Sequence, residues 1–269
     1  DLIAGSEGTL GIVTEAELGL LPVARATISG VVFFRTADAA LAACDAWRPV
    51  PALNMLEFLD GPSLELLRPR FPEIPHGAGG ALLIEQDLGS EADLDAWLER
   101  MESAGALDEE SWFGAEERDR ERFRAFRHAL PEIVNDVVRR RGFLKVGSDY
   151  AVPLDRGREM YEHYRRRLET EFPGQYVIFG HAGDAHLHVN ILPESGEQFE
   201  RSQRLMVEFA HEVVRMGGSV SAEDGLGKRK AHLLEIQYPA AALEAMRSVK
   251  TRLDRHWLLG RGDLFPAPA

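Results

Sequence analysis

The segment His181-Ala-Gly-Asp-Ala-His-Leu-His-Val-Asn190 constrains the fold of this chain more than any other. Apolar, β-branched runs lie on both sides of it, and a Gly-Asp pair lies near its start. Two such runs around a tight turn predict a β-hairpin. Because alternate residues of a strand share a face, we expect His186, His188 and Asn190 to point the same way, with His181 across the turn.

The hairpin gathers three of the nine histidines of the chain, which indicates a divalent metal site. A catalytic zinc-type site often uses two histidines and one carboxylate and leaves one position open. His181 and His188 are the best pair, and Glu223, in a loop flanked by glycines, is the natural third ligand. His186 is expected behind the ligands or in solvent. The residue pattern alone leaves open that these are ordinary hairpin histidines and a loop carboxylate.

Three further features could take part in a reaction, and each has an ordinary alternative. Asp224 follows Glu223 directly, so one carboxylate could hold a metal while the other accepts a proton, although Asp-Gly is also a common turn. Arg127 could clamp a substrate carboxylate, or be one of several arginines on a charged helix. The loop Gly5–Gly11 offers backbone N–H groups to an anion or a flavin edge. It is neither a phosphate-binding loop nor a dinucleotide fingerprint, because a strand is expected after it.

Charge and composition exclude several classes of function. The net charge of −13 disfavours nucleic acid as a partner. No apolar run approaches the ~20 residues needed to span a bilayer. The single cysteine, Cys44, excludes an internal disulfide and suits a reducing compartment. We therefore expect a cytoplasmic protein, and peripheral attachment at the inner face of the membrane is left open.

The order of periodic segments predicts an α+β fold with a largely antiparallel sheet and helices on one face. Besides the hairpin, strands are expected at Ile12–Leu21, Thr27–Phe34, Leu53–Leu59, Ala78–Gln86 and Phe143–Val152. Helices are expected at Ala37–Trp47, Ser63–Leu67, Glu91–Ala104, Ala115–Arg141, Leu154–Glu171, Gly196–Met216, Leu226–Ile236 and Ala240–Arg255. Thr36 and Ser90 are expected to cap helices, and Pro131 to break or kink the long one.

Four segments together resemble one family. Asp1–Glu15 (DLIAGSEGTLGIVTE), Gly180–Asn190, Ser219–Lys228 (SVSAEDGLGK) and Trp257–Phe265 (WLLGRGDLF) are similar, in this order, to motifs of the FAD-linked oxidases of the vanillyl-alcohol oxidase superfamily. The branch they resemble holds the D-lactate, D-2-hydroxyglutarate and glycolate dehydrogenases. The resemblance implies a ferredoxin-like cap domain.

The resemblance also implies a domain division. Residues 1–24 would be the C-terminal remnant of the FAD-binding domain. Residues 25–269 would form the C-terminal substrate, or cap, domain, with 219–269 returning to the flavin site. The chain begins without Met or a signal peptide, so we expect a piece of a longer polypeptide that is inactive alone.

The implied activity is oxidation of a D-lactate-like D-2-hydroxy acid to the 2-keto acid, with hydride transfer to FAD. A divalent metal, Zn or Mn, would assist. The implied roles are metal ligation by His181, His188 and Glu223, substrate binding by Arg127 and Asn190, proton abstraction by Asp224, and flavin contact by Ser6, Gly8, Thr9, Gly11 and Ile12. The sequence departs from the family at two positions: His128 replaces a usual Glu, and Asp224 replaces a usual His.

Two alternatives stay open at this point. One is a non-catalytic cap domain that has lost its base and serves in assembly or metabolite binding; the other is a metal-dependent hydrolase. The expected partners are a small 2-hydroxy-acid substrate, the N-terminal FAD-binding domain and an unidentified electron acceptor. No nucleic acid is expected, and a homodimer is left open.

Overall fold

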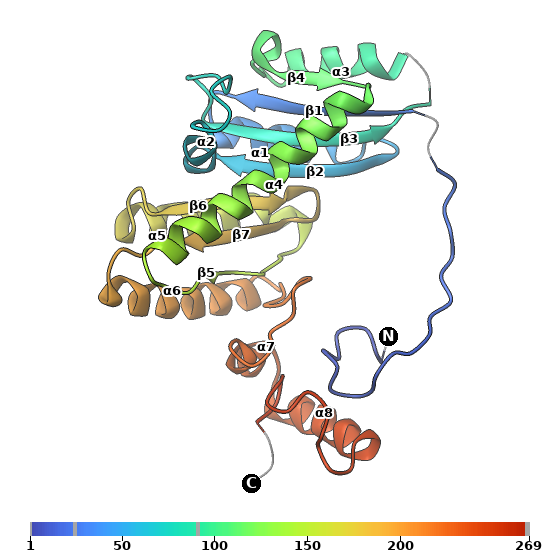
Figure 1. Cartoon of the computed structure of the whole chain (residues 1–269), viewed down its shortest axis with the longest axis vertical. Helices are drawn as coiled ribbons and strands as arrows, with labels where there is room; N and C mark the ends of the chain where they lie inside the picture. Colours follow the sequence, from blue (N-terminus) through green and yellow to red (C-terminus); the bar gives the residue numbers. More distant parts are fainter. Residues whose placement is uncertain (1, 24–25, 90–91, 267–269) are drawn as a thin grey trace.

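A seven-stranded antiparallel sheet runs through the computed structural model, which describes residues 2–23, 26–89 and 92–266 (Figure 1). The strand order is β4-β1-β3-β2-β6-β7-β5. The strands are β1 (Thr27–Phe34), β2 (Leu53–Asp60), β3 (Gly80–Asp87), β4 (Trp112–Gly114), β5 (Val146–Gly147), β6 (Tyr176–His181) and β7 (His186–Ile191). The helices are α1 (Ala37–Trp47), α2 (Gly61–Leu67), α3 (Ala92–Ser103), α4 (Glu117–Arg140), α5 (Gly157–Glu171), α6 (Gly196–Arg215), α7 (Leu234–Gln237) and α8 (Ala240–Leu253).

The first four strands form a ferredoxin-like unit. Strand β3 lies between β1 and β2 and pairs antiparallel with both, so β1-α1-β2 is a split βαβ unit. Strand β2 then joins the second part of the sheet through two residue pairs, Phe58↔Gly180 and Leu59↔Phe179. The predicted α+β class, the largely antiparallel sheet and the ferredoxin-like topology are therefore confirmed.

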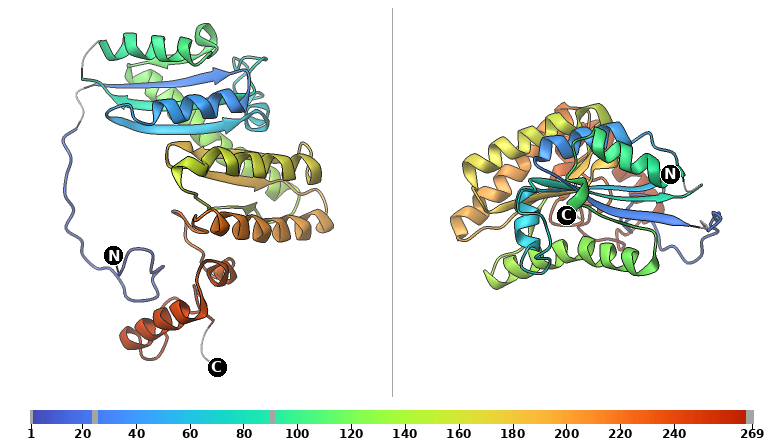
Figure 2. Two further views of the ribbon diagram at one scale, coloured as in Figure 1. Left: turned by 180° about the vertical axis from the view of Figure 1, so that it is seen from behind. Right: turned by 90° about the horizontal axis from the view of Figure 1, so that it is seen from above.

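Helices cover both faces of the sheet, which corrects the expectation of one covered face. Helices α1, α3, α5 and α6 pack on one face, and α2 and α4 pack on the other (Figure 2). The physical reason lies in strands such as β1, where all eight residues are buried. A strand that is apolar on both sides needs cover on both sides.

The predicted helix cap at Thr36 forms. The hydroxyl oxygen of Thr36 accepts a hydrogen bond from the backbone N–H of Ala39 at 3.1 Å, so Thr36 caps α1 as predicted. The long helix α4 continues through Pro131, so of the expected break or kink the break does not occur. Its buried stripe, which includes Phe126 and Val134 on either side of the proline, anchors it to the sheet. Ser90 lies outside the described residues.

The expected strand Ile12–Leu21 does not form within the described residues 2–23. The segment is extended and lies along the side of the molecule, and the side chains of Ile12 and Leu20 are 78% and 91% exposed (Figure 1). A strand needs a neighbour to bond its N–H and C=O groups, and this segment has none in the described structure. Residues 143–152 likewise form only the short β5 and isolated bridges at Ala151.

The N-terminal glycine-rich loop lies beside the C-terminal segment that contains α8 (Figure 1). The buried ammonium of Lys250 donates hydrogen bonds to the carbonyl oxygens of Thr9 (2.6 Å) and Leu259 (2.8 Å) and to Asp254 (2.5 Å). Only the second half of the expected helix Leu226–Ile236 is helical, as a 3-10 turn at Ala231–Leu233 followed by α7, and the preceding loop includes Gly227 with a φ of 54°. Within the described residues, none of the helices combines the length and the apolar character that a membrane span requires.

Candidate functional site

The histidine hairpin forms as predicted. Strands β6 and β7 pair from Tyr176↔Ile191 to His181↔His186, and the turn closes through Ala185 in the left-handed region, with a φ of 51°. Gly180 has a φ of 139°, and a Cβ there would lie 2.9 Å from Cδ2 of His188. Glycine at this position therefore leaves room for the His188 ring, which lies beside the ring of His186 with centroids 4.5 Å apart.

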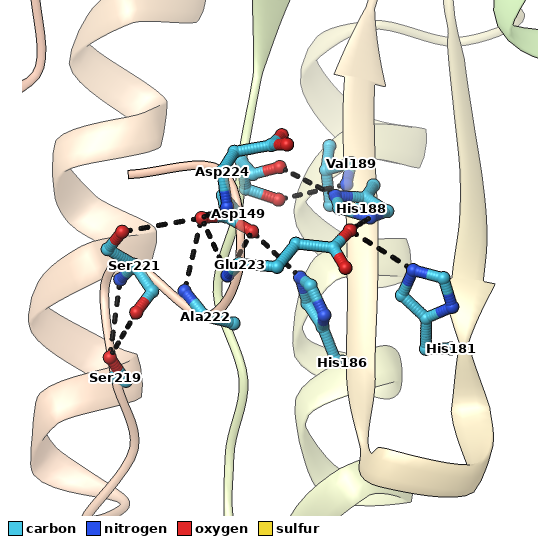
Figure 3. A network of polar contacts seen from close by, with 11 residues as sticks. Asp149, His181, His186, His188, Val189, Ser219, Ser221, Ala222, Glu223 and Asp224 are labelled. Carbon is cyan, nitrogen blue, oxygen red and sulfur yellow. Dashed lines mark hydrogen bonds and ion pairs between the residues drawn. The ribbon is translucent and has the colours of Figure 1, made fainter. Parts of the chain in front are cut away.

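Glu223 comes from a distant loop and meets two of these histidines (Figure 3). Its Oε1 atom lies 3.1 Å from Nε2 of His181 and 3.3 Å from Nε2 of His188. With His186, these residues offer ligand atoms that all lie within 4.8 Å of one another. The structure thus brings the three expected ligands together, and two imidazole nitrogens with one carboxylate oxygen suit a divalent ion.

The opposite nitrogens of the same two rings are also held. Nδ1 of His181 lies 3.2 Å from Oε1 of Glu57, and Nδ1 of His188 lies 3.1 Å from the carbonyl oxygen of Ser148. Histidines that bind metals almost always donate their other N–H to a carboxylate or carbonyl, which fixes the ring and leaves one nitrogen free to coordinate. Both rings are therefore oriented with Nε2 toward Glu223.

Asp149 joins the hairpin to the Glu223 loop and was not anticipated from the sequence. Its carboxylate accepts a hydrogen bond from Nε2 of His186 at 3.0 Å, so His186 is buried behind the ligands rather than in solvent. It also accepts the backbone N–H groups of Ala222 (3.1 Å), Glu223 (3.3 Å) and Asp224 (3.0 Å) (Figure 3). Burial acts to raise the pKa of Asp149, but the hydrogen bonds from His186 and from these amides outweigh it and lower the pKa.

Glu57 was also missed, and it connects Arg127 to the histidines. It lies on β2, is 8% exposed and forms ion pairs with Arg127 and His181. Burial acts to raise the pKa of Glu57, yet the hydrogen bonds from His181 and Arg127 lower it. The hydrogen bond to Glu57 is in turn the main cause that raises the pKa of His181 to about 9. A cavity of about 520 Å³ lined by Arg127, Glu57 and His181 opens beside them.

The remaining expected substrate-side residues border the same cluster. Asn190 is 1% exposed, and neither atom of its carboxamide has a hydrogen-bond partner among the described residues. Asp224 is exposed, and one of its carboxylate oxygens lies within 4.8 Å of candidate ligand atoms of Asp149 and His188. A buried amide without a partner is unusual in proteins, so the carboxamide of Asn190 has unused hydrogen-bonding capacity.

The glycine-rich loop lies against the loop that carries Glu223. The carboxylate of Glu7 accepts hydrogen bonds from the backbone N–H groups of Leu226 and Gly227, both at 2.7 Å. Gly8, with a φ of 71°, has open space where a Cβ would lie. The hydroxyl of Thr9 donates to the carbonyl oxygen of Ser6 at 2.6 Å, so this side chain is used within the loop. Gly11 is half-buried, and Ile12 is exposed.

Known proteins resemble this chain over nearly its whole length. The model for "FAD linked oxidases, C-terminal domain" matches residues 23–264. The glycolate oxidase subunit GlcD of Bacillus subtilis is 28% identical over 277 residues, covering 100% of this chain and 57% of that protein. The mitochondrial D-2-hydroxyglutarate dehydrogenase of Bos taurus is 29% identical over 289 residues, covering 100% of this chain and 49% of that protein. The chain spans about half the length of the curated relatives it matches.

Solved structures share the fold. An alkyldihydroxyacetonephosphate synthase aligns with a TM-score of 0.62 at 15% identity, over 98% of this chain and 48% of that one. The 4-ethylphenol oxidase of Gulosibacter chungangensis aligns with a TM-score of 0.59 at 15% identity, over 91% of this chain and 55% of that one. At this identity the likeness concerns the fold alone.

Proposed function

The chain belongs to the family of FAD linked oxidases through their C-terminal domain, and from this premise we propose that it is the substrate-side part of an FAD- and metal-dependent 2-hydroxy-acid dehydrogenase. The observation that carries the proposal is the convergence of His181 and His188 on Glu223. Glu57, which forms ion pairs with both His181 and Arg127, connects Arg127 to this cluster. The relatives named for glycolate and D-2-hydroxyglutarate support a small 2-hydroxy acid as the substrate class.

The residues fit a divalent ion. Nε2 of His181, Nε2 of His188 and a carboxylate oxygen of Glu223 would hold it, because both rings are anchored at Nδ1 and face the same oxygen. A bound ion of this kind, zinc or manganese, lowers the pKa of a hydroxyl group that coordinates it. His181 has to give up its proton to bind the ion, since Glu57 raises its pKa to about 9 in the protein alone.

The protein's own groups then bind and orient the hydroxy acid. The guanidinium of Arg127 binds the substrate carboxylate and fixes the direction of the C2–H bond. The unpaired carboxamide of Asn190 bonds a polar group of the substrate. Asp224 accepts the hydroxyl proton as the C2 hydride leaves, so that one proton and one hydride account for the two electrons and two hydrogens lost in forming the 2-keto acid.

The glycine-rich loop would border the flavin. Its backbone is open at Gly8, and Glu7 fixes it to the loop after Glu223 and Asp224. FAD supplies the hydride acceptor of such a reaction. We therefore assign residues 1–24 to the end of the FAD-binding domain and 25–269 to the substrate domain, with 219–269 returning to the flavin side. The residues proposed to lie beside the flavin are Ser6, Gly8, Thr9, Gly11 and Ile12. Thr9 would contribute by stabilising the loop, because its hydroxyl bonds the carbonyl oxygen of Ser6.

The test uses the full-length protein that contains this chain. We expect a flavin absorbance band and its loss when D-lactate, glycolate or D-2-hydroxyglutarate is added without oxygen. L-Lactate and L-2-hydroxyglutarate should leave the band unchanged, and glycolate, which is achiral, has no such control. Treatment with a chelator should abolish the reduction, and added zinc or manganese should restore it. A bound flavin that none of these acids reduces would indicate the non-catalytic cap domain, and a protein without flavin would contradict the proposal outright.

A further inference from the structure

One dipeptide, Ser148-Asp149, contacts both the β7 side of the histidine hairpin and the loop that carries Glu223. The carbonyl oxygen of Ser148 bonds Nδ1 of His188 at 3.1 Å, and its hydroxyl accepts the backbone N–H of Val189 at 2.9 Å. The side chain of Asp149 bonds His186 at 3.0 Å. Two consecutive residues that follow β5, at the edge of the sheet, therefore hold strand β7 of the hairpin.

The same carboxylate reaches the other side of the cluster. Asp149 accepts three consecutive backbone N–H groups, those of Ala222, Glu223 and Asp224, and the hydroxyl of Ser221 at 3.4 Å. Asp149 is 1% exposed, whereas the three residues it holds are exposed. Successive N–H groups that point at one anion form a concave anion-binding nest. Here the anion belongs to the protein, and the loop folds around it.

This arrangement gives Asp149 a role that depends on its charge and on both of its oxygens. Neutral asparagine would offer one acceptor oxygen and turn two donor hydrogens toward groups that are themselves donors. At least one of the amides or the His186 ring would lose its acceptor. The loop carrying Glu223 would then no longer be held at a fixed distance from the histidines.

We propose that Asp149 is the positioning residue of the site: it sets the backbone of Glu223 and Asp224 against the hairpin, and so holds the third metal ligand in place before any ion binds. The metal part of this inference rests on the proposed function. Its positioning part does not, because the nest is formed by the protein alone.

The experiment compares Asp149→Asn with a matched control, Asp60→Asn, in the full-length protein. Asp60 is also 1% exposed and also accepts two backbone N–H groups, of Ser63 (2.8 Å) and Ile178 (2.9 Å), but it caps α2. Amide hydrogen exchange of residues 222–224 is measured without metal, and the dissociation constant for zinc is measured by competition with a chelator. Melting temperatures report the general loss of stability.

We expect Asp149→Asn to speed exchange at residues 222–224 by more than about tenfold and to weaken zinc binding by about 10- to 100-fold, the usual effect of groups behind metal ligands. Asp60→Asn should lower the melting temperature and change neither quantity. Exchange and affinity within twofold of wild type in Asp149→Asn would overturn the inference, as would equal effects in Asp60→Asn.

Two further outcomes can be distinguished by these measurements: a wild-type protein that binds no metal, and an Asp149→Asn variant that does not fold. If wild-type protein binds no divalent ion, the proposed function loses its metal, while the exchange comparison still decides the role of Asp149. If Asp149→Asn does not fold, Asp149→Glu keeps the charge and displaces the oxygens by one methylene. The same two measurements apply to it, and unchanged exchange at residues 222–224 would again contradict the positioning role.

Discussion

Nε2 of His181 lies 3.1 Å from Oε1 of Glu223, a residue 42 positions later in the chain. At this separation both atoms can coordinate the same ion. Replacing either residue should therefore remove one metal ligand and leave the hairpin folded. We expect His181→Ala and Glu223→Ala each to weaken zinc binding by more than about 100-fold, beyond the effect of groups that only support ligands. The control is His211→Ala on the exposed side of α6. Equal affinities in all three variants would contradict the assignment.

Arg127 should contribute through the shape of its guanidinium as well as its charge. Lysine keeps the charge but cannot form two parallel hydrogen bonds with a carboxylate. We expect Arg127→Lys to lower kcat/KM for the hydroxy acid by about 10- to 150-fold, the equivalent of one charged hydrogen bond, chiefly through KM. Arg139→Lys, on the same helix but exposed and outside the lining of the cavity, is the matched control. A similar loss in both variants would refute a specific role.

Asp224 is expected to be the base, in place of the histidine usual in the resembling family. Asp224→Asn should lower kcat by about 100-fold or more, the range that general base catalysis supplies. Asp224→His should recover activity and move the acidic limb of the pH profile toward about 6.5, the reference pKa of histidine. Steady-state rates from pH 4.5 to 9 measure both effects. Unchanged turnover in Asp224→Asn would rule out the role.

Asp60 should make the stability of the protein depend on pH. Burial raises its pKa from 3.8 in the unfolded chain to about 7 in the folded protein. The folded state thus holds the proton more tightly, so the contribution is complete below about pH 4 and is lost as pH rises through 7. We expect the wild-type free energy of unfolding to fall relative to Asp60→Asn by at most about 1.4 kcal/mol per pH unit. Urea unfolding between pH 4.5 and 7.5 tests this; parallel curves would contradict it.

Cys44 should be inert in the folded protein. It is 1% exposed on α1, and burial raises its pKa to about 12. Since the thiolate is the reactive form, we expect a disulfide reagent at pH 8 to react at least about 100-fold more slowly with native protein than with protein unfolded in guanidinium, where one equivalent should react. Full reaction of the native protein within the time taken by the unfolded control would count against this packing.

The sequence predicted the parts of the site that lie in short motifs. His181 and His188 share one hairpin, whose strand pattern is local, and Glu223 stands out because glycines flank it. Asp149 and Glu57 were missed because their function arises from contacts 37 and 124 residues away in the chain, with His186 and His181. The only signal for either residue in the sequence is an acidic side chain next to apolar ones, and this signal does not predict which residue the side chain contacts.

The errors in the fold have the same origin. Thr27–Phe34 was predicted to the residue because its β-branched and aromatic residues, with few polar ones, suffice to define a buried strand. Ile12–Leu21 has a similar pattern but no neighbour in the described structure, so it stays extended. The helices on the second face, α2 and α4, could not be assigned to it because periodicity defines the apolar side of a helix and not the sheet face that receives it.

The hydrogen bond from Lys250 to the carbonyl of Thr9 joins residues 241 positions apart. During synthesis the glycine-rich loop leaves the ribosome well before its anchor on α8, which follows 241 residues later. The hairpin and Asp149 can therefore assemble on the nascent chain, while the loop stays untethered until translation has passed α8. Assembly of the complete site therefore has to wait until α8 has been synthesised, and a ribosome stalled before Lys250 should display the histidines without the glycine-rich loop in place.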